Sequence, residues 1–186
     1  MDGVAAQAHI SKASLYRDYP SKDALYAAVV RDWVDRGFDA MSPHITELAE
    51  TGQARVGLLG FARVLQTGLL SPAVLAMRTL IAAEALRFPD IAADYVTRSW
   101  TRNIRMLAEA LSVLSARGLL RIDDPGVAAE QLTWLVVAAP LNRLTLQAGA
   151  HPYTADELQS LATQGITTFL SRYGHQDTER PRGILD

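Results

Sequence analysis

Apolar residues recur at intervals of three or four along nearly the whole chain, and this spacing constrains the fold more than any other feature. Such intervals place apolar side chains on one face of an α-helix, whereas a half-buried strand needs strict alternation. No segment of strand length alternates in that way. With 186 residues the chain is long enough to bury a sizeable core. The pattern therefore predicts an all-α protein.

Capping residues and prolines divide this pattern into helices. Ser11 and Ser21 are suited to cap the starts of two helices, and the second should end or kink at Pro43. Asp124 before a proline marks another start, and residues 154–157 form a capping box. The expected helices run from Ser11 to about Tyr19, from Ser21 to the region of Pro43, and over 53–70, 72–88, 89–116, 125–148 and 154–173.

Glycines and the end of the chain complete this division. Gly118 and Gly149 each follow an expected helix and are suited to its C-terminal cap. Residues 176–186 have no sustained apolar face, so we expect a loose tail.

Composition excludes several classes of protein. The absence of cysteine excludes disulfides, thiolate metal sites and cysteine nucleophiles. The net charge of −2 gives no overall attraction to nucleic acid or to anionic membranes, so any such binding needs a local patch. The longest apolar run, 134–141, is far short of the roughly 20 residues that cross a bilayer, and the start lacks a signal peptide. We expect a soluble cytoplasmic protein with no membrane partner.

Residues 3–26 have the pattern of a helix-turn-helix, with a tight turn at His9-Ile10. Val4, Ala5 and Ala8 would face inward from the first helix, while Ile10, Leu15 and Tyr19 would pack beneath the second. The second helix would then present hydrogen-bond donors to a major groove, namely Lys12, Ser14, Tyr16 and Arg17. Both lysines of the chain, Lys12 and Lys22, lie in this segment. The local charge thus suits DNA, although such motifs also occur as simple packing corners.

At these residues the chain resembles the tetracycline-repressor (TetR) family of transcriptional regulators. The resemblance rests on Ile10-Ser11-Lys12-Ala13-Ser14-Leu15-Tyr16 and on Tyr19-Pro20-Ser21-Lys22-Asp23-Ala24-Leu25. Residues 81–89, IAAEALRFP, also look like a helix of the family's effector domain. The resemblance implies that DNA is contacted by Ser11, Lys12, Ser14, Tyr16, Arg17 and Lys22.

Three departures from the family pattern bear on DNA binding. The family has a first helix before this segment, so the helix-turn-helix is incomplete as written. His9 stands where the family commonly has glycine, and histidine tolerates the positive φ that such a turn needs. Asp18 replaces a usual Tyr or His; it would repel phosphates or could instead hold Arg17, Lys22 or a base amino group. A second hypothesis is therefore a dimeric helical ligand-binding protein without DNA binding.

The resemblance also implies a division of the chain. Residues 1–28 would form the partial DNA-binding domain, 29–175 a helical effector-binding and dimerisation domain, and 176–186 the tail. The last two helices, rich in leucine, would pair with those of a second subunit, although a monomer could bury them in its own core. Candidate effector-binding residues are polar or aromatic side chains within apolar helices, namely Glu84, Trp100, Asn103, Trp134 and Asn142.

Each of these five has a simpler interpretation. Glu84 can form an ion pair with Arg87, and the others can be packed or solvated in the ordinary way. No catalytic motif is present, and His44 with Glu47 is a weak metal-binding pattern. We therefore expect no catalytic residue, no metal and no cofactor. The predicted function is a homodimeric, ligand-responsive regulator, most simply a repressor, whose partners are an inverted-repeat DNA operator and a small-molecule effector.

Overall fold

The computed structural model describes residues 1–147 and 152–175, which form helices and one isolated backbone bridge between Leu120 and Gly174. The prediction of an all-α fold is confirmed. In chain order the elements are α1 (Asp2–Gln7), α2 (Lys12–Asp18), α3 (Lys22–Glu50), α4 (Ala54–Leu69), α5 (Pro72–Glu84), α6 (Pro89–Val96), the π-helix η1 (Thr97–Thr101), α7 (Arg102–Ala116), α8 (Pro125–Leu146) and α9 (Ala155–Tyr173).

The helix starts follow the predicted capping residues. The side chains of Ser11, Ser21 and Asp124 each accept a hydrogen bond at 3.0 Å from the backbone N–H three residues on. Thr154 and Glu157 form the complete capping box at the start of α9. These local interactions satisfy N–H groups that have no partner within their own helix.

The predicted helix ends are less accurate. α3 neither ends at Pro43 nor near it, but continues to Glu50. Pro43 removes one backbone hydrogen bond, yet Ile45 and Leu48 beyond it are buried in the core, so packing holds the helix together. Gly118 has φ of 73° and ends α7, as predicted. The predicted cap at Gly149 and the tail 176–186 lie outside the described residues.

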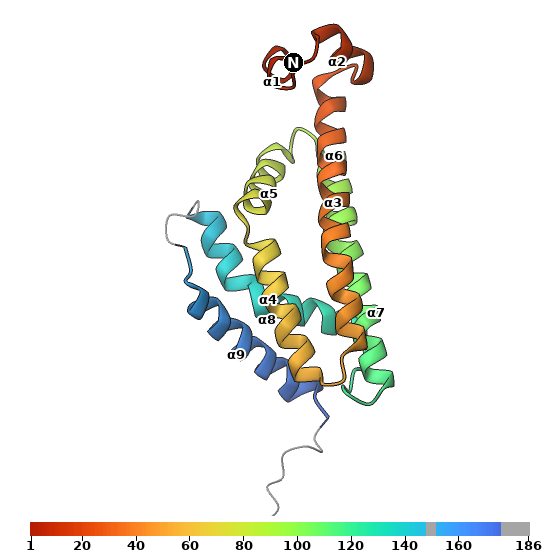
Figure 1. The fold of residues 1–186 in the computed structure, drawn as a ribbon, viewed down its shortest axis with the longest axis vertical. Coiled ribbons are helices and arrows are strands. Elements are labelled where there is room, and N and C mark those ends of the chain that lie inside the picture. The colour runs from red at the N-terminus through yellow and green to blue at the C-terminus, as the bar shows by residue number, and fades with distance from the viewer. Residues whose placement is uncertain (148–151, 176–186) are drawn as a thin grey trace, which may run out of the picture.

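The main core lies in the lower half of the molecule in Figure 1, where α4, α7, α8 and α9 pack around the end of α3. Its largest fully buried side chains include Phe169, Leu111 and Leu132. Helices α8 and α9 approach closely because Gly165 has no side chain: a Cβ there would stand 2.7 Å from the Leu135 carbonyl oxygen. Of the apolar side chains of the last two helices, Leu132, Val136, Ile166 and Phe169 belong to this core, and Leu144 is buried as well.

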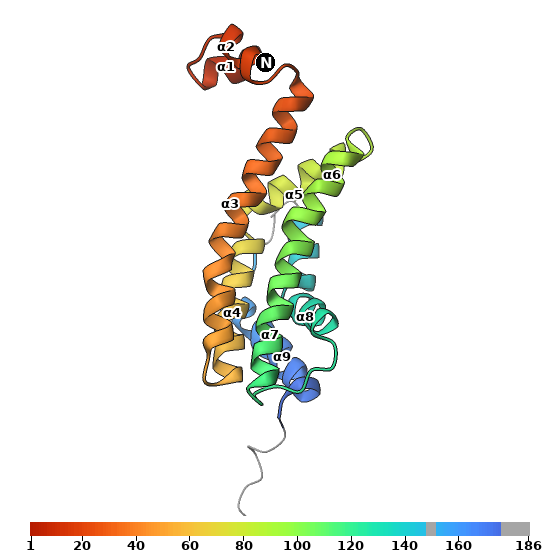
Figure 2. The same cartoon turned by 90° about the vertical axis from the view of Figure 1, so that its right-hand side faces the viewer.

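The N-terminal unit, defined here as α1 and α2, sits at the far end of α3, away from this core (Figures 1 and 2). Within it only Ala5 and Leu15 are buried. Val4 and Ile10, expected to pack, are exposed by 46% and 43%, and Ala8 is exposed as well. The expectation was wrong for these three because two short helices can bury little more than one contact between themselves.

Among the described residues, no single helix has the length and apolar composition needed to cross a bilayer. Only α4 and α5 taken together would meet that test, and they are bent by 59° at the break between them.

Candidate functional site

The first candidate surface is the outer face of α2. Lys12, Tyr16 and Arg17 are exposed there, and Ser14 is half-buried. The turn before α2 depends on His9, whose φ of 54° lies in the left-handed region and confirms that this histidine takes the conformation glycine usually supplies. The turn directs α2 across the end of α3, as Figure 2 shows.

Two carboxylates lie beside the cations of this surface. Lys12 Nζ lies 2.7 Å from Asp2 Oδ1, and this contact raises the pKa of Lys12 and lowers that of Asp2. Arg17 Nε lies 3.4 Å from Asp18 Oδ1, the alternative role suggested for Asp18. Both pairs are exposed, so each ion pair contributes little to stability and leaves its cation accessible to solvent.

Of the remaining predicted DNA contacts, Ser11 is already hydrogen-bonded within the protein, whereas Lys22 is exposed. Ser11 is engaged as the cap of α2, and its hydroxyl also lies 2.9 Å from that of Ser14. Lys22 is exposed in the first turn of α3, next to the end of α2. The structure thus brings all six predicted residues to one end of the molecule.

The second candidate site is a cavity of about 580 Å³ between α3, α4, α5, α6, η1, α7 and α8. Its walls are mainly apolar and include Trp33, Phe38, Met41, Phe61, Val64 and Leu107. This volume falls in the range of sites that bind drug-sized organic molecules, which are typically apolar with a few placed polar groups.

Polar groups on one wall come from α6, η1 and α7. Ser99 Oγ donates to the Tyr95 carbonyl at 2.6 Å, and Asn103 Nδ2 donates to the Ser99 carbonyl at 2.6 Å. The Asn103 Oδ1 atom is buried and has no partner among the described residues. Burial raises the pKa of Tyr95, while the charge of Arg78, also on the cavity wall, opposes that shift. A neutral phenol and an amide oxygen therefore face the cavity.

Two of the five predicted effector-binding residues, Trp100 and Asn103, line this cavity. The other three do not. Glu84 ends α5 and lies 3.9 Å from Arg87, as in the simpler interpretation. Trp134 and Asn142 are exposed on α8, because the inward face of that helix is filled by smaller side chains of the core.

Trp134 nevertheless contacts a residue of the cavity wall. Glu130 accepts a hydrogen bond at 3.1 Å from each of two indole N–H groups, those of Trp100 and Trp134. The two rings lie 4.7 Å apart between centroids. One carboxylate thus fixes an aromatic pair that reaches from the cavity to the outer surface of α8.

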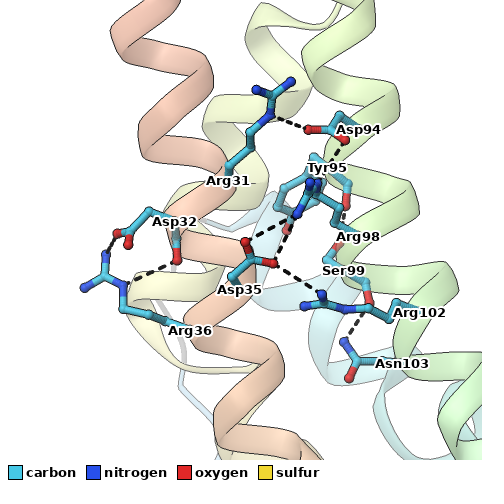
Figure 3. Close-up of polar contacts among 10 residues, drawn as sticks. All are labelled: Arg31, Asp32, Asp35, Arg36, Asp94, Tyr95, Arg98, Ser99, Arg102 and Asn103. Atoms are coloured by element: carbon cyan, nitrogen blue, oxygen red, sulfur yellow. Dashed lines mark hydrogen bonds and ion pairs between the residues drawn. The ribbon is translucent and has the colours of Figure 1, made fainter. Parts of the chain in front are cut away.

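An ionic cluster joins α3 to the helix opposite, as Figure 3 shows. We define it as Arg31, Asp35, Asp94, Arg98 and Arg102. Asp35 contacts Arg98 at 3.3 Å and Arg102 at 3.2 Å. Asp94 contacts Arg31 at 3.0 Å and Arg98 at 3.1 Å, and these contacts, Arg31 first, hold the pKa of Asp94 below its usual value. Arg102 also stacks on Phe38, with its guanidinium carbon 3.5 Å from the ring centroid.

The sequence interpretation missed this cluster and three polar residues of the cavity wall, Arg78, Tyr95 and Ser99. A signal for the cluster was present. Arg31 and Asp35 are four residues apart, and Asp94, Arg98 and Arg102 repeat that interval, so each set forms a charged stripe on one helix face. The charges follow one another in opposite order, Arg then Asp on α3 and Asp then Arg on the other helix, and this complementary order could have predicted that these helices pair.

Metal binding has little support in residues 1–147 and 152–175, which contain no group of three or more His, Asp or Glu side chains able to hold an ion. His44 Nδ1 lies 3.7 Å from Glu47, an ordinary contact between neighbouring turns of α3.

Comparisons with known proteins agree on one family. A family model described as bacterial regulatory proteins of the tetR family matches residues 1–29, and one described as the C-terminal domain of AefR-like transcriptional repressors matches residues 56–175. No curated protein matches the sequence.

Solved structures give the same result over most of the chain. A protein from Mesorhizobium loti MAFF303099, described as a TetR-family transcriptional regulator, is 28% identical with a TM-score of 0.89, and the match covers 92% of this chain and 85% of that one. The flavonoid-responsive regulator FrrA is 27% identical with a TM-score of 0.70, covering 95% and 87%. A TetR-family regulator from Pseudomonas syringae pv. tomato DC3000 shares the fold at 20% identity and a TM-score of 0.72, covering 94% and 85%.

Proposed function

Since the chain belongs to the TetR family of transcriptional regulators, which bind DNA and are not enzymes, we propose that it is a ligand-responsive repressor that binds an inverted-repeat operator as a homodimer. The α2 helix would enter the major groove, with Lys12, Tyr16 and Arg17 on its exposed face. Lys22, at the start of α3, would neutralise a phosphate beside the groove, and Ser11 and Ser14 would add hydroxyl contacts.

The observation that carries this proposal is the single helix α3. Its 29 residues span about 43 Å at 1.5 Å per residue, from the end of α2 to the main core. Val34, Phe38 and Met41 of the same helix line the cavity. A ligand that changes the position of α3 there would therefore change the position of α2.

The ionic cluster supplies a second contact between ligand site and DNA site. Asp35 of α3 holds Arg98 of η1 and Arg102 of α7, while Tyr95, Ser99 and Asn103 of the same continuous helix face the cavity. A ligand that displaces η1 would move Asp35 with it (Figure 3). The operator is released only if the ligand binds the displaced state more tightly than the DNA-binding state.

The homodimer is proposed from the outer face of α8 and α9. Trp134, Leu135 and Val127 remain 41–47% exposed on α8, although much of the leucine content of these helices is buried in the core. Pairing α8 and α9 with a second copy would cover these side chains and place two α2 helices on one side of the dimer. FrrA is described as flavonoid-responsive, which supports a small organic molecule as the effector here.

Fluorescence anisotropy with labelled fragments of the promoter next to the coding sequence tests the proposal. We expect Lys12→Ala with Tyr16→Ala to weaken binding to the preferred fragment by about 100-fold, since each specific contact contributes about 1–3 kcal/mol. Arg36→Ala, which removes an exposed charge near the middle of α3, is the matched control and should bind normally. Equal binding to every fragment, or no effect of the double variant, would contradict specific recognition.

A dimeric ligand-binding protein that does not bind DNA is the second candidate. The exposed Val4 and Ile10 favour it, because they leave the N-terminal unit with little core of its own. Adding the residues encoded upstream of Met1 distinguishes the two: binding only by the extended chain means that this unit needs further packing to act. Binding by neither chain would favour the second candidate.

A further inference from the structure

The cavity contains an arginine that forms no ion pair with any residue of the described part of the chain. The charged or titratable side chains that line it include His44, Arg63 and Arg78, and no Asp or Glu is among the described residues of the lining. Arg63 donates to Gln159 at 2.6 Å and is exposed, while His44 lies beside Glu47. Arg78 forms no ion pair within residues 1–147 and 152–175, and its Nε is buried without a hydrogen-bond partner.

Arg78 differs from its neighbouring arginines in charge pairing and not in its unpartnered nitrogen, since Nε and Nη2 of Arg102 are also buried without a hydrogen bond. Arg31, Arg98 and Arg102 lie on the helices around the same cavity, and each contacts a carboxylate of Asp35 or Asp94 at 3.0–3.3 Å. A buried N–H of a guanidinium that lacks an acceptor is unfavourable, because the group loses its hydration without replacement. The phenol of Tyr95 is near Arg78 but is neutral, so it cannot balance the charge.

We propose that the cavity binds an apolar organic acid whose single anionic group pairs with Arg78. This inference rests on the proposed function, since it assigns a chemical class to the effector. A guanidinium presents parallel N–H donors that match the two oxygens of a carboxylate. The apolar body of the ligand would occupy the walls formed by Phe38, Phe61, Val64 and Leu107, and the 580 Å³ volume accommodates a scaffold of two or three fused or linked rings.

Two fluorescent probes of matched shape test the charge directly. 8-Anilinonaphthalene-1-sulfonate has one anionic group, and N-phenyl-1-naphthylamine has the same ring system without it. We expect Arg78→Met to weaken binding of the anionic probe by at least about tenfold and to change that of the neutral probe by less than about twofold, since a charged hydrogen bond is lost while the apolar walls remain. Arg36→Met removes the same charge outside the cavity lining and should affect neither probe.

Two further variants assign the binding site. Val64→Trp projects an indole ring into the cavity and should weaken binding of both probes; unchanged affinity for both would place them elsewhere and overturn the proposal. Arg78→Lys keeps the charge and should restore part of the preference for the anionic probe. If Arg78→Met weakens both probes equally and Arg78→Lys restores no preference, or if Arg78→Met has no effect, the assignment is wrong.

These measurements need no DNA, so they fail or succeed separately from the proposed function. Selective loss of the anionic probe in a protein that binds no promoter fragment would support the ligand class and reject the regulator. Normal operator binding with no preference of the cavity for the anionic probe would support the regulator and reject the proposed ligand class.

Discussion

The N-terminal unit and the rest of the molecule differ in how their residues are used. The unit buries only Ala5 and Leu15 and exposes most of its other side chains. The remainder buries a continuous core that includes Phe169, Leu111 and Leu132, and it encloses a cavity beside that core. We therefore expect the function of the N-terminal unit to depend on its exposed side chains, and that of the remainder to depend on its buried core and cavity.

Helix α3 runs through both regions, so its sequence has to meet the requirements of each. The early turns of α3 pack Tyr26 and Val30 in a small second cluster with Met77 and Ile81 of α5, whereas its later turns contribute Ile45 and Leu48 to the main core. The two ends should respond differently to mutation, and the following experiments, in decreasing order of effect, test that difference.

Truncating a core residue should produce the largest change. Phe169→Ala should lower the free energy of unfolding by about 3–5 kcal/mol, because Phe169 is 1% exposed and leaves a cavity. Leu15→Ala, made in the N-terminal unit, should leave the main transition unchanged in urea denaturation followed by circular dichroism. A similar shift of that transition in both variants would show that the two regions unfold as one unit.

Removing Asp35 should have the next largest effect. Asp35→Ala leaves Arg98 and Arg102 without their shared carboxylate, and we expect a loss of about 1–2 kcal/mol in thermal unfolding. Asp32→Ala is the matched control on the same helix, because its pair with Arg36 is exposed and should contribute less than about 0.5 kcal/mol. Equal losses would mean that the cluster does not join the helices energetically.

Removing two helix caps should have smaller effects, one on operator binding and the other on the main unfolding transition. Ser11→Ala should destabilise α2 by about 1 kcal/mol and weaken operator binding about fivefold without changing the main unfolding transition. Thr154→Ala removes the capping box of α9 and should lower the main transition by a similar amount while operator binding stays normal. Anisotropy and thermal denaturation of both variants check these outcomes. The prediction is wrong if Ser11→Ala lowers the main transition or if Thr154→Ala weakens operator binding.

The smallest expected change is a gain. Asp2→Asn releases Lys12 from its carboxylate partner, so operator affinity should rise about two- to threefold at low salt. Asp156→Asn makes the same change of net charge at the start of α9, far along the chain from α2, and should leave affinity unchanged. A rise in both variants would indicate a general charge effect instead of a specific one.

Features set by a few consecutive residues were predictable from the sequence. Ser11, Ser21, Asp124 and Thr154 cap helices because their partners lie three positions away, and the family resemblance rests on one short segment. The exposed residues of α2 were predictable for the same reason.

Features that depend on several helices at once were not predictable in this way. The path of α3 through Pro43 is decided by the packing of Ile45 and Leu48 against other helices. The cavity combines residues from α3, α4, α5, α6, η1, α7 and α8. The sequence alone therefore could not separate Trp134 and Asn142, which lie outside the cavity, from Trp100 and Asn103, which line it. Only the distances between helices decide which side chains share a wall.

The π-helix η1 has a consequence for how this segment can change in length. A π turn closes on the residue five positions back, so it is equivalent to an α-helical turn with one residue inserted. Deleting one residue of Thr97–Thr101 would restore a regular α-helix and leave α7 in nearly its present phase, because five residues of a π turn rotate the chain about as far as four α-helical residues. Asn103 would then stay on the cavity wall and Arg102 beside Asp35, so homologues can lose one residue in this segment, whereas a deletion within α7 itself would rotate the residues after it by about 100°.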